Sequence, residues 1–135
     1  MNVLIDTSIW SLALRHRSSR NAESAELAAL VKEGRARLVG PIRQEVLSGI
    51  RAKQQFERLR LQLRSFPDLS VGTEDYERAA ELFNACRTRG VQGDHMDFLI
   101  CSIAVREDLD IYTTDKDFSN YAQHIPIRLY VPRAR

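Results

Sequence analysis

The sequence is poor in the residues that define several classes of protein. Its two cysteines, Cys86 and Cys101, lack Cys-x-x-Cys spacing, so they suggest neither a zinc site nor a disulfide framework, and we expect two buried free thiols. The three histidines are scattered, and we expect them on the surface or in loops rather than in catalysis. No apolar stretch approaches the ~20 residues of a membrane span, so no membrane association is expected.

The start of the chain also lacks the apolar stretch of a signal peptide, because Asp6 interrupts it. We therefore expect a cytoplasmic protein. The hydrophobic fraction of 44% and the charged fraction of 28% are ordinary for a globular chain. A length of 135 residues is typical of one domain, which we expect to span residues 1–135.

Lysine is scarce as well, since only Lys32, Lys53 and Lys116 are lysines among the 20 basic residues. Arginine donates paired hydrogen bonds to phosphate oxygens, whereas lysine acts more as a point charge. The composition therefore hints at a polyanionic partner, although an arginine-rich sequence also arises in a GC-rich genome.

Short β-branched apolar runs alternate with segments of helical periodicity. A strand is expected over Val3–Ile5, and the cap-type hydroxyls of Thr7 and Ser8 then precede a helix. Further helices are predicted over about 22–32, over a segment that begins at Pro41, over a separate segment that ends before Pro67, over 73–90 and over 96–105. Further strands are predicted over 37–39, 69–71, 111–113 and 127–131. This alternation predicts an α/β sandwich with a mostly parallel sheet.

Two of these helices differ in their apolar pattern. The segment from Met96 to Val105 is apolar nearly all round, so this helix should be central. The helix over 22–32 is amphipathic, with one face expected on the core. That face consists of Ala25, Leu27, Ala28, Leu30 and Val31.

Four acids stand where separate elements begin or end. Asp6 and Asp115 follow strands, and function in parallel sheets gathers outside the carboxyl ends of strands. Asp97 opens so apolar a helix that its charge is costly to bury unless a partner such as a metal ion pairs with it. Mg²⁺ and Mn²⁺ prefer carboxylate oxygens. Taken singly, each acid also has a structural explanation: Asp97 or Asp94 as a partner of a helix dipole, Asp117 as a helix cap, and Glu45 as a solvated helix residue.

The order of these acids resembles that of the PIN-domain ribonucleases, specifically the VapC-type toxins of bacterial toxin–antitoxin pairs. The resemblance covers the whole chain and rests on Leu4-Ile5-Asp6-Thr7-Ser8, Glu45 on a mid-chain helix, Asp97-Phe98-Leu99-Ile100, and Thr113-Thr114-Asp115-Lys116-Asp117-Phe118. It implies a single PIN domain with a PIN-like three-layer α/β/α sandwich and a mostly parallel sheet. A haloacid-dehalogenase-type phosphatase is not expected, because it needs a second aspartate where this sequence has Ser8.

The resemblance also implies the residues of a metal-dependent endoribonuclease site, which hydrolyses RNA and leaves 5′-phosphate and 3′-hydroxyl ends. Mg²⁺ or Mn²⁺ would be held by Asp6, Glu45, Asp97 and Asp115, with Ser8, Thr113 and Asp117 supporting them. Asp94 competes with Asp97 for its role, but the apolar run that follows favours Asp97. The best candidates for RNA contact are Arg15, Arg17 and Arg20.

The partners implied are an RNA substrate and a cognate VapB-type antitoxin, with a homodimer or a toxin–antitoxin hetero-oligomer as the assembly. The antitoxin groove is expected on the early helices, those that contain Trp10, Leu14, Leu27 and Leu30, whereas the Trp10 and Leu14 side chains themselves are expected mainly in the core. The alternative from another functional class is a non-catalytic PIN-fold RNA-binding or scaffold module. It is disfavoured because all four acids are present.

Overall fold

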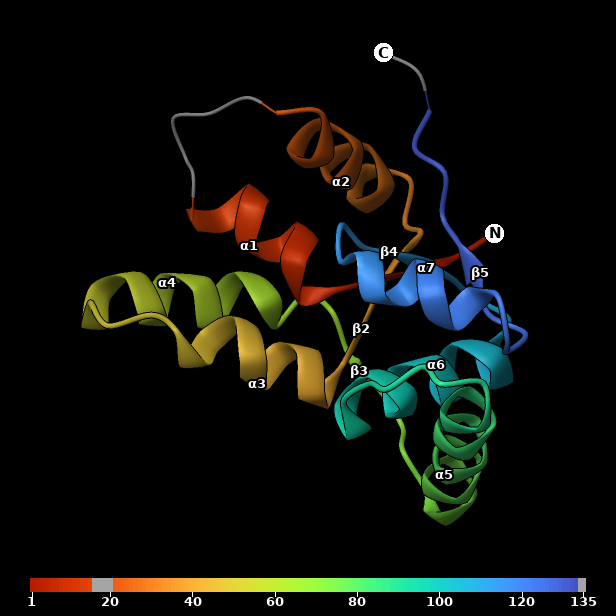
Figure 1. The fold of residues 1–135 in the computed structure, drawn as a ribbon. Helices are drawn as coiled ribbons and strands as arrows, with labels where there is room; N and C mark the ends of the chain where they lie inside the picture. The colour runs from red at the N-terminus through yellow and green to blue at the C-terminus, as the bar shows by residue number, and fades with distance from the viewer. Residues whose placement is uncertain (16–20, 134–135) are drawn as a thin grey trace.

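The computed structural model describes residues 1–15, without the side chain of Arg15, and residues 21–133, and arranges them around a five-stranded parallel sheet. The strands lie in the order β3-β2-β1-β4-β5, and each neighbouring pair is parallel. Figure 1 shows the helices arranged around these strands. The predicted α/β class and the mostly parallel sheet are therefore confirmed. The strands are β1 (Val3–Ile5), β2 (Ala36–Val39), β3 (Asp68–Leu69), β4 (Asp110–Tyr112) and β5 (Arg128–Leu129).

Helices cover both faces of this sheet. Alternate residues of a strand point to opposite faces, and all three residues of β1 have no exposed surface. Among the described helices, none combines the length and the apolar content that crossing a membrane requires. The helices are α1 (Thr7–Arg15), α2 (Ala22–Lys32), α3 (Gly40–Ser48), α4 (Lys53–Leu63), α5 (Thr73–Thr88), α6 (His95–Glu107) and α7 (Lys116–Ala122).

The predicted central helix is confirmed in α6. Its side chains Phe98, Ile100 and Ile103 are at most 2% exposed, and Cys101 is fully buried. Cys86 of α5 is also fully buried, so both cysteines are buried free thiols, as predicted. The apolar content of α6 therefore reflects its position in the core.

The amphipathic helix α2 buries an acid that periodicity does not reveal. Glu26 is 1% exposed, and it accepts hydrogen bonds from the Tyr130 hydroxyl over 2.7 Å and from Arg133 Nη2 over 3.1 Å. Because the C-terminal segment supplies these donors, the charge can be buried. The predicted apolar face is right at Leu27 and Leu30, which are buried, and wrong at Ala25, Ala28 and Val31, which are exposed.

A second buried acid joins α5 to α6. Asp75 is 4% exposed, and it accepts hydrogen bonds from the backbone N–H of Gly72 over 2.9 Å and from Arg106 Nε over 2.7 Å. The buried Ser102 hydroxyl donates to the backbone carbonyl of Asp75 over 2.8 Å. The network fixes the start of α5 against α6 and thereby helps to set the position of α6.

The side of the sheet to which strands are added changes between β1 and β4, and we call this place the reversal point. From β1 the chain adds β2 and β3 on one side, and it then crosses over to add β4 and β5 on the other. The last residue of β1, Ile5, pairs with the last residue of β4, Tyr112. The segments that follow these two strands therefore emerge side by side at the carboxyl edge, where ligands bind in sheets of this kind.

Candidate active site

Asp6 lies directly at this reversal point and is 7% exposed. Its Oδ2 accepts hydrogen bonds from the Thr113 hydroxyl over 2.7 Å and from the Ser8 hydroxyl over 3.2 Å. The Ser8 oxygen in turn accepts from the backbone N–H of Thr114 over 3.1 Å. These bonds join the end of β1 to the segment after β4, so the hydroxyls of Ser8 and Thr113 hold the Asp6 carboxylate in place.

Asp115 and Asp117 lie at the start of α7. Asp115 is the residue that caps this helix, because its Oδ1 accepts from the backbone N–H of Asp117 over 2.9 Å. The interpretation of Asp117 as the cap is therefore wrong. The backbone N–H of Asp115 donates to the Thr113 hydroxyl oxygen over 2.9 Å, so one threonine touches both Asp6 and the Asp115 backbone.

Asp97 approaches from the first turn of α6. Burial raises the pKa of its carboxyl to about 6, the Tyr121 hydroxyl opposes this rise by hydrogen bonding, and the charges of Asp94, Asp115 and Asp6 add to it. The Tyr121 hydroxyl donates to Asp97 Oδ2 over 2.8 Å. Mutual repulsion of this kind is expected where carboxylates gather without a cation.

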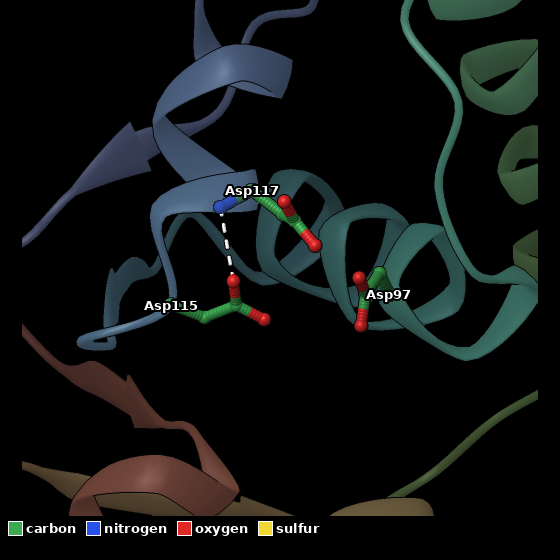
Figure 2. A group of neighbouring side chains, drawn as sticks. All are labelled: Asp97, Asp115 and Asp117. Carbon is green, nitrogen blue, oxygen red and sulfur yellow. Dashed lines mark hydrogen bonds between the residues drawn. The ribbon is translucent and has the colours of Figure 1, made fainter.

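Three carboxylates converge in one place. One oxygen each of Asp97, Asp115 and Asp117 lies within 4.8 Å of the others. Figure 2 shows Asp97 projecting from α6 and the other two side chains projecting toward it from the start of α7. Oxygen donors at this spacing match the preference of Mg²⁺ and Mn²⁺ for several carboxylates from separate elements, so the residues fit such an ion.

The predicted residues differ in how closely they gather. Asp97 and Asp115 belong to the three-carboxylate group, and Asp117, predicted only as a supporting residue, belongs to it as well. Asp6 interacts electrostatically with Asp97 but is outside this group among the described residues. Glu45 is exposed on α3 and is also outside it. Asp94 caps α6 by accepting from the backbone N–H of Met96, which accounts for it without a role in the site.

The residues predicted to contact RNA and the helices predicted to contact the antitoxin belong to the early part of the chain. Arg17 and Arg20 lie outside the described residues, and Arg15 is described only as the last residue of α1. Trp10, Leu27 and Leu30 are at most 4% exposed and belong to the core, as expected for Trp10, so a groove on these helices would lie beside them rather than on their side chains. Trp10 donates to the Ile5 carbonyl over 3.1 Å and packs edge-on against Phe66, which explains its burial.

Sequence reasoning missed the side chain that contacts Asp97. Tyr121 is separated from Asp97 by 24 positions and lies on another helix, so no local motif joins them. The only sign in the sequence is a tyrosine in the apolar pattern of α7, where a phenylalanine would fill the core without a polar atom. A buried tyrosine hydroxyl generally has a hydrogen-bond partner, and an acid is a common one.

Comparison with known proteins relates this chain to one protein family. The family model for the PIN domain matches residues 3–123. Ribonuclease VapC11 of Mycobacterium tuberculosis is 30% identical over 125 residues, which cover 90% of this chain and 92% of the relative. The structure of FitAcB from Neisseria gonorrhoeae superposes with a TM-score of 0.75 at 19% identity, covering 96% of this chain and 97% of that chain.

A second solved structure has the same fold. VapBC2 from Rickettsia felis, bound to a DNA fragment from its promoter, superposes with a TM-score of 0.75 at 18% identity and covers 96% of this chain and 98% of that chain. At this identity the structures show the shared fold. The family model and the mycobacterial relative extend the match to sequence, over almost the whole chain in each case. The chain therefore belongs to the PIN-domain family.

Proposed function

We propose that this chain is a metal-dependent endoribonuclease that acts as the toxin of a type II toxin–antitoxin pair. The observation that carries the proposal is the convergence of the Asp97, Asp115 and Asp117 oxygens within 4.8 Å at the reversal point of the sheet. The similarity to a protein named as a VapC ribonuclease supports the choice of RNA as substrate. We further propose that residues 1–135 form one PIN domain.

In this proposal Asp6, Glu45, Asp97 and Asp115 hold Mg²⁺ or Mn²⁺, and the structure adds Asp117 as a candidate ligand. When bound, such an ion supplies activation of water for attack on phosphorus and neutralises charge on the leaving oxygen. The chain's own part is to orient the acids. Ser8 and Thr113 fix the Asp6 carboxylate through the hydrogen bonds described above.

The test is cleavage of RNA with and without a divalent ion. We expect total RNA to be cut in the presence of Mg²⁺ or Mn²⁺, cutting to stop in excess EDTA, and activity to return when the ion is restored, because the proposed reaction depends on ion-bound acids. Cleavage that persists in EDTA would contradict the proposal. The alternative, a non-catalytic RNA-binding or scaffold module, predicts RNA binding without cleavage under either condition.

We also propose a VapB-type antitoxin as the partner, encoded beside this chain, with assembly as a homodimer or a toxin–antitoxin hetero-oligomer. The structures of VapBC2 from Rickettsia felis and of a toxin–antitoxin complex from Klebsiella pneumoniae support this partner, because their fold is shared with this chain. RNA contact by Arg15, Arg17 and Arg20 remains part of the proposal. Because Trp10, Leu27 and Leu30 are buried, we place the groove on the outer surface of the early helices.

One hollow on that surface is suited to an amphipathic segment of the partner. It has a volume of about 230 Å³ between α1 and α4, and its lining is half apolar and half polar: Ala13, Leu14 and Leu59, with Gln55, Arg58 and Gln62. Apolar side chains of a partner helix commonly occupy such grooves. The hollow is therefore our candidate for the antitoxin contact.

We expect the neighbouring small protein to copurify with this chain and to inhibit cleavage, and Leu14→Glu to weaken this binding because it puts a charge into the hollow. The matched control is Leu61→Glu on α4, where the leucine is 60% exposed and does not line the hollow. Binding is measured by calorimetry. Equal binding by both variants would exclude the hollow as the antitoxin contact. If no adjacent inhibitory protein exists and expression of this chain alone is harmless, the toxin role is excluded, but the nuclease activity is not.

A further inference from the structure

We infer that Tyr121 is a positioning residue for Asp97, and that Gly93 provides the space in which the Tyr121 hydroxyl reaches it. The inference rests on the proposed metal site, because it concerns how one of the proposed ligands is oriented. Tyr121 touches neither substrate nor ion in this scheme. It acts through the hydrogen bond that its hydroxyl donates to Asp97 Oδ2 over 2.8 Å.

The Tyr121 ring is fixed on several sides. It has no exposed surface, its centroid lies 4.6 Å from that of Phe98 on α6, and it lies 5.3 Å from that of Phe118 on α7. Since the ring cannot shift within close-packed neighbours, its hydroxyl has a defined position. The Asp97 carboxylate, which accepts from that hydroxyl, is therefore held at a defined angle.

Gly93 lies against the same hydroxyl from the loop before α6. A Cβ at this position would come within 2.3 Å of the Tyr121 hydroxyl oxygen, 2.7 Å of its Cζ and 2.8 Å of Cε2 of Phe98. These are ring atoms held in the core rather than the free end of a flexible chain. Any side chain at position 93 must therefore displace the hydroxyl, and glycine is required there for reasons of space.

The consequence of this arrangement concerns the affinity for the ion. A carboxylate that binds a metal is usually itself hydrogen-bonded, and loss of such a partner typically weakens metal binding by about 10- to 100-fold. Without the hydroxyl, the Asp97 carboxylate can rotate away from Asp115 and Asp117. The ion then has to restrict that rotation, which lowers the affinity.

The test compares Mn²⁺ binding by the whole protein and by two phenylalanine variants. Tyr121→Phe removes only the hydroxyl and keeps the packed ring, and we expect it to bind Mn²⁺ about tenfold more weakly. Tyr130→Phe is the matched control, because its hydroxyl also donates to a buried acid over 2.7 Å, and that acid, Glu26, is outside the three-carboxylate group. Its affinity for Mn²⁺ should be unchanged. Calorimetry gives the affinities, and circular dichroism shows that each variant is folded.

Gly93→Ala provides a second route to the same loss. We expect it to weaken Mn²⁺ binding at least as much as Tyr121→Phe does, because the added Cβ displaces the hydroxyl and also presses on the rings of Tyr121 and Phe98. Equal Mn²⁺ affinity of Tyr121→Phe and the unmodified protein would overturn the inference, as would an equal loss in Tyr130→Phe. If the unmodified protein binds no Mn²⁺, the proposed metal site itself is wrong, and the inference falls with it.

Discussion

RNA cleavage by an Asp97→Asn variant is expected to fall by about two to three orders of magnitude. The charge stabilisation that a bound ion supplies is worth several kcal/mol, and each ~1.4 kcal/mol corresponds to a factor of about ten in rate. Asparagine keeps the size of the side chain and can still accept from Tyr121, but it lacks the charge that favours a cation. Single-turnover cleavage of a labelled RNA at saturating Mg²⁺ measures the effect.

The matched control is Asp94→Asn, one turn earlier. Asp94 is exposed and caps α6 through the backbone N–H of Met96, and asparagine caps a helix about as well as aspartate, so this replacement should leave both stability and cleavage nearly unchanged. If cleavage instead survives in Asp97→Asn and is lost in Asp94→Asn, the ligand on α6 is Asp94.

The same Asp97→Asn variant should resist heat better than the unmodified protein when EDTA is present. Because the pKa of Asp97 is raised from 3.8 to about 6, the folded chain holds this proton more tightly than the unfolded chain. The ionised carboxylate therefore destabilises the ion-free fold above that pKa, and asparagine removes this cost. We expect a gain of about 1 kcal/mol, or a few degrees in Tm, near neutral pH. The gain should shrink as the pH falls to the ordinary pKa of an aspartate.

Asp75→Ala is expected to produce the largest loss of stability, about 3 kcal/mol, or roughly 10 °C in Tm. Asp75 is 4% exposed, and its removal takes the buried carboxylate from the Arg106 guanidinium, which keeps Glu107 and the Ser70 carbonyl. It also leaves the backbone N–H of Gly72, just before α5, without its side-chain acceptor. Burial alone would raise the pKa of Asp75, but hydrogen bonds from Gly72 and Arg106 outweigh it and hold that pKa below its ordinary value. The stabilisation is therefore present above the ordinary pKa and is lost as pH falls through the lowered one.

The neighbouring Glu74→Ala serves as the control for this change. Glu74 is also in the first turn of α5 and is exposed, so only its modest interaction with the helix dipole is lost. Thermal unfolding of both variants at neutral pH compares them directly. A similar small loss in both would mean that the Asp75–Arg106 contact contributes little to the fold.

The sequence predicted the first two strands well because they are short, mostly apolar and followed by turn or cap residues, whereas the strands predicted over 69–71 and 127–131 are the shorter Asp68–Leu69 and Arg128–Leu129, each with one charged residue. Val3–Ile5 and the strand before Gly40 are placed correctly by this local pattern, and the helix over 22–32 has the predicted bounds. The parallel arrangement followed from the alternation of strands and helices. From this, the proximity of Asp6 and Asp115 could be expected before any coordinates, since both follow strands that end at the same edge.

The interactions that the sequence could not reveal all join distant segments. Glu26 is buried only because Tyr130 and Arg133 reach it from the C-terminal segment, more than 100 positions away. Tyr121 and Asp97 likewise meet through the packing of α7 on α6. Helical periodicity assigns an acid to the solvent face and a tyrosine to the core, and it cannot say which polar partner tertiary packing will supply.

The pairing of β1 with β4 has a consequence during synthesis of the chain. Asp6 and Thr113, which hydrogen-bond across these strands, are 107 positions apart, and a chain grows at about 5–20 residues per second. The first acid therefore leaves the ribosome roughly 5 to 20 seconds before the segment that completes its surroundings. A nascent chain has no assembled acidic group during that interval. The order of synthesis thus keeps the proposed acidic group incomplete until the segment that carries Thr113, Asp115 and Asp117 has been made.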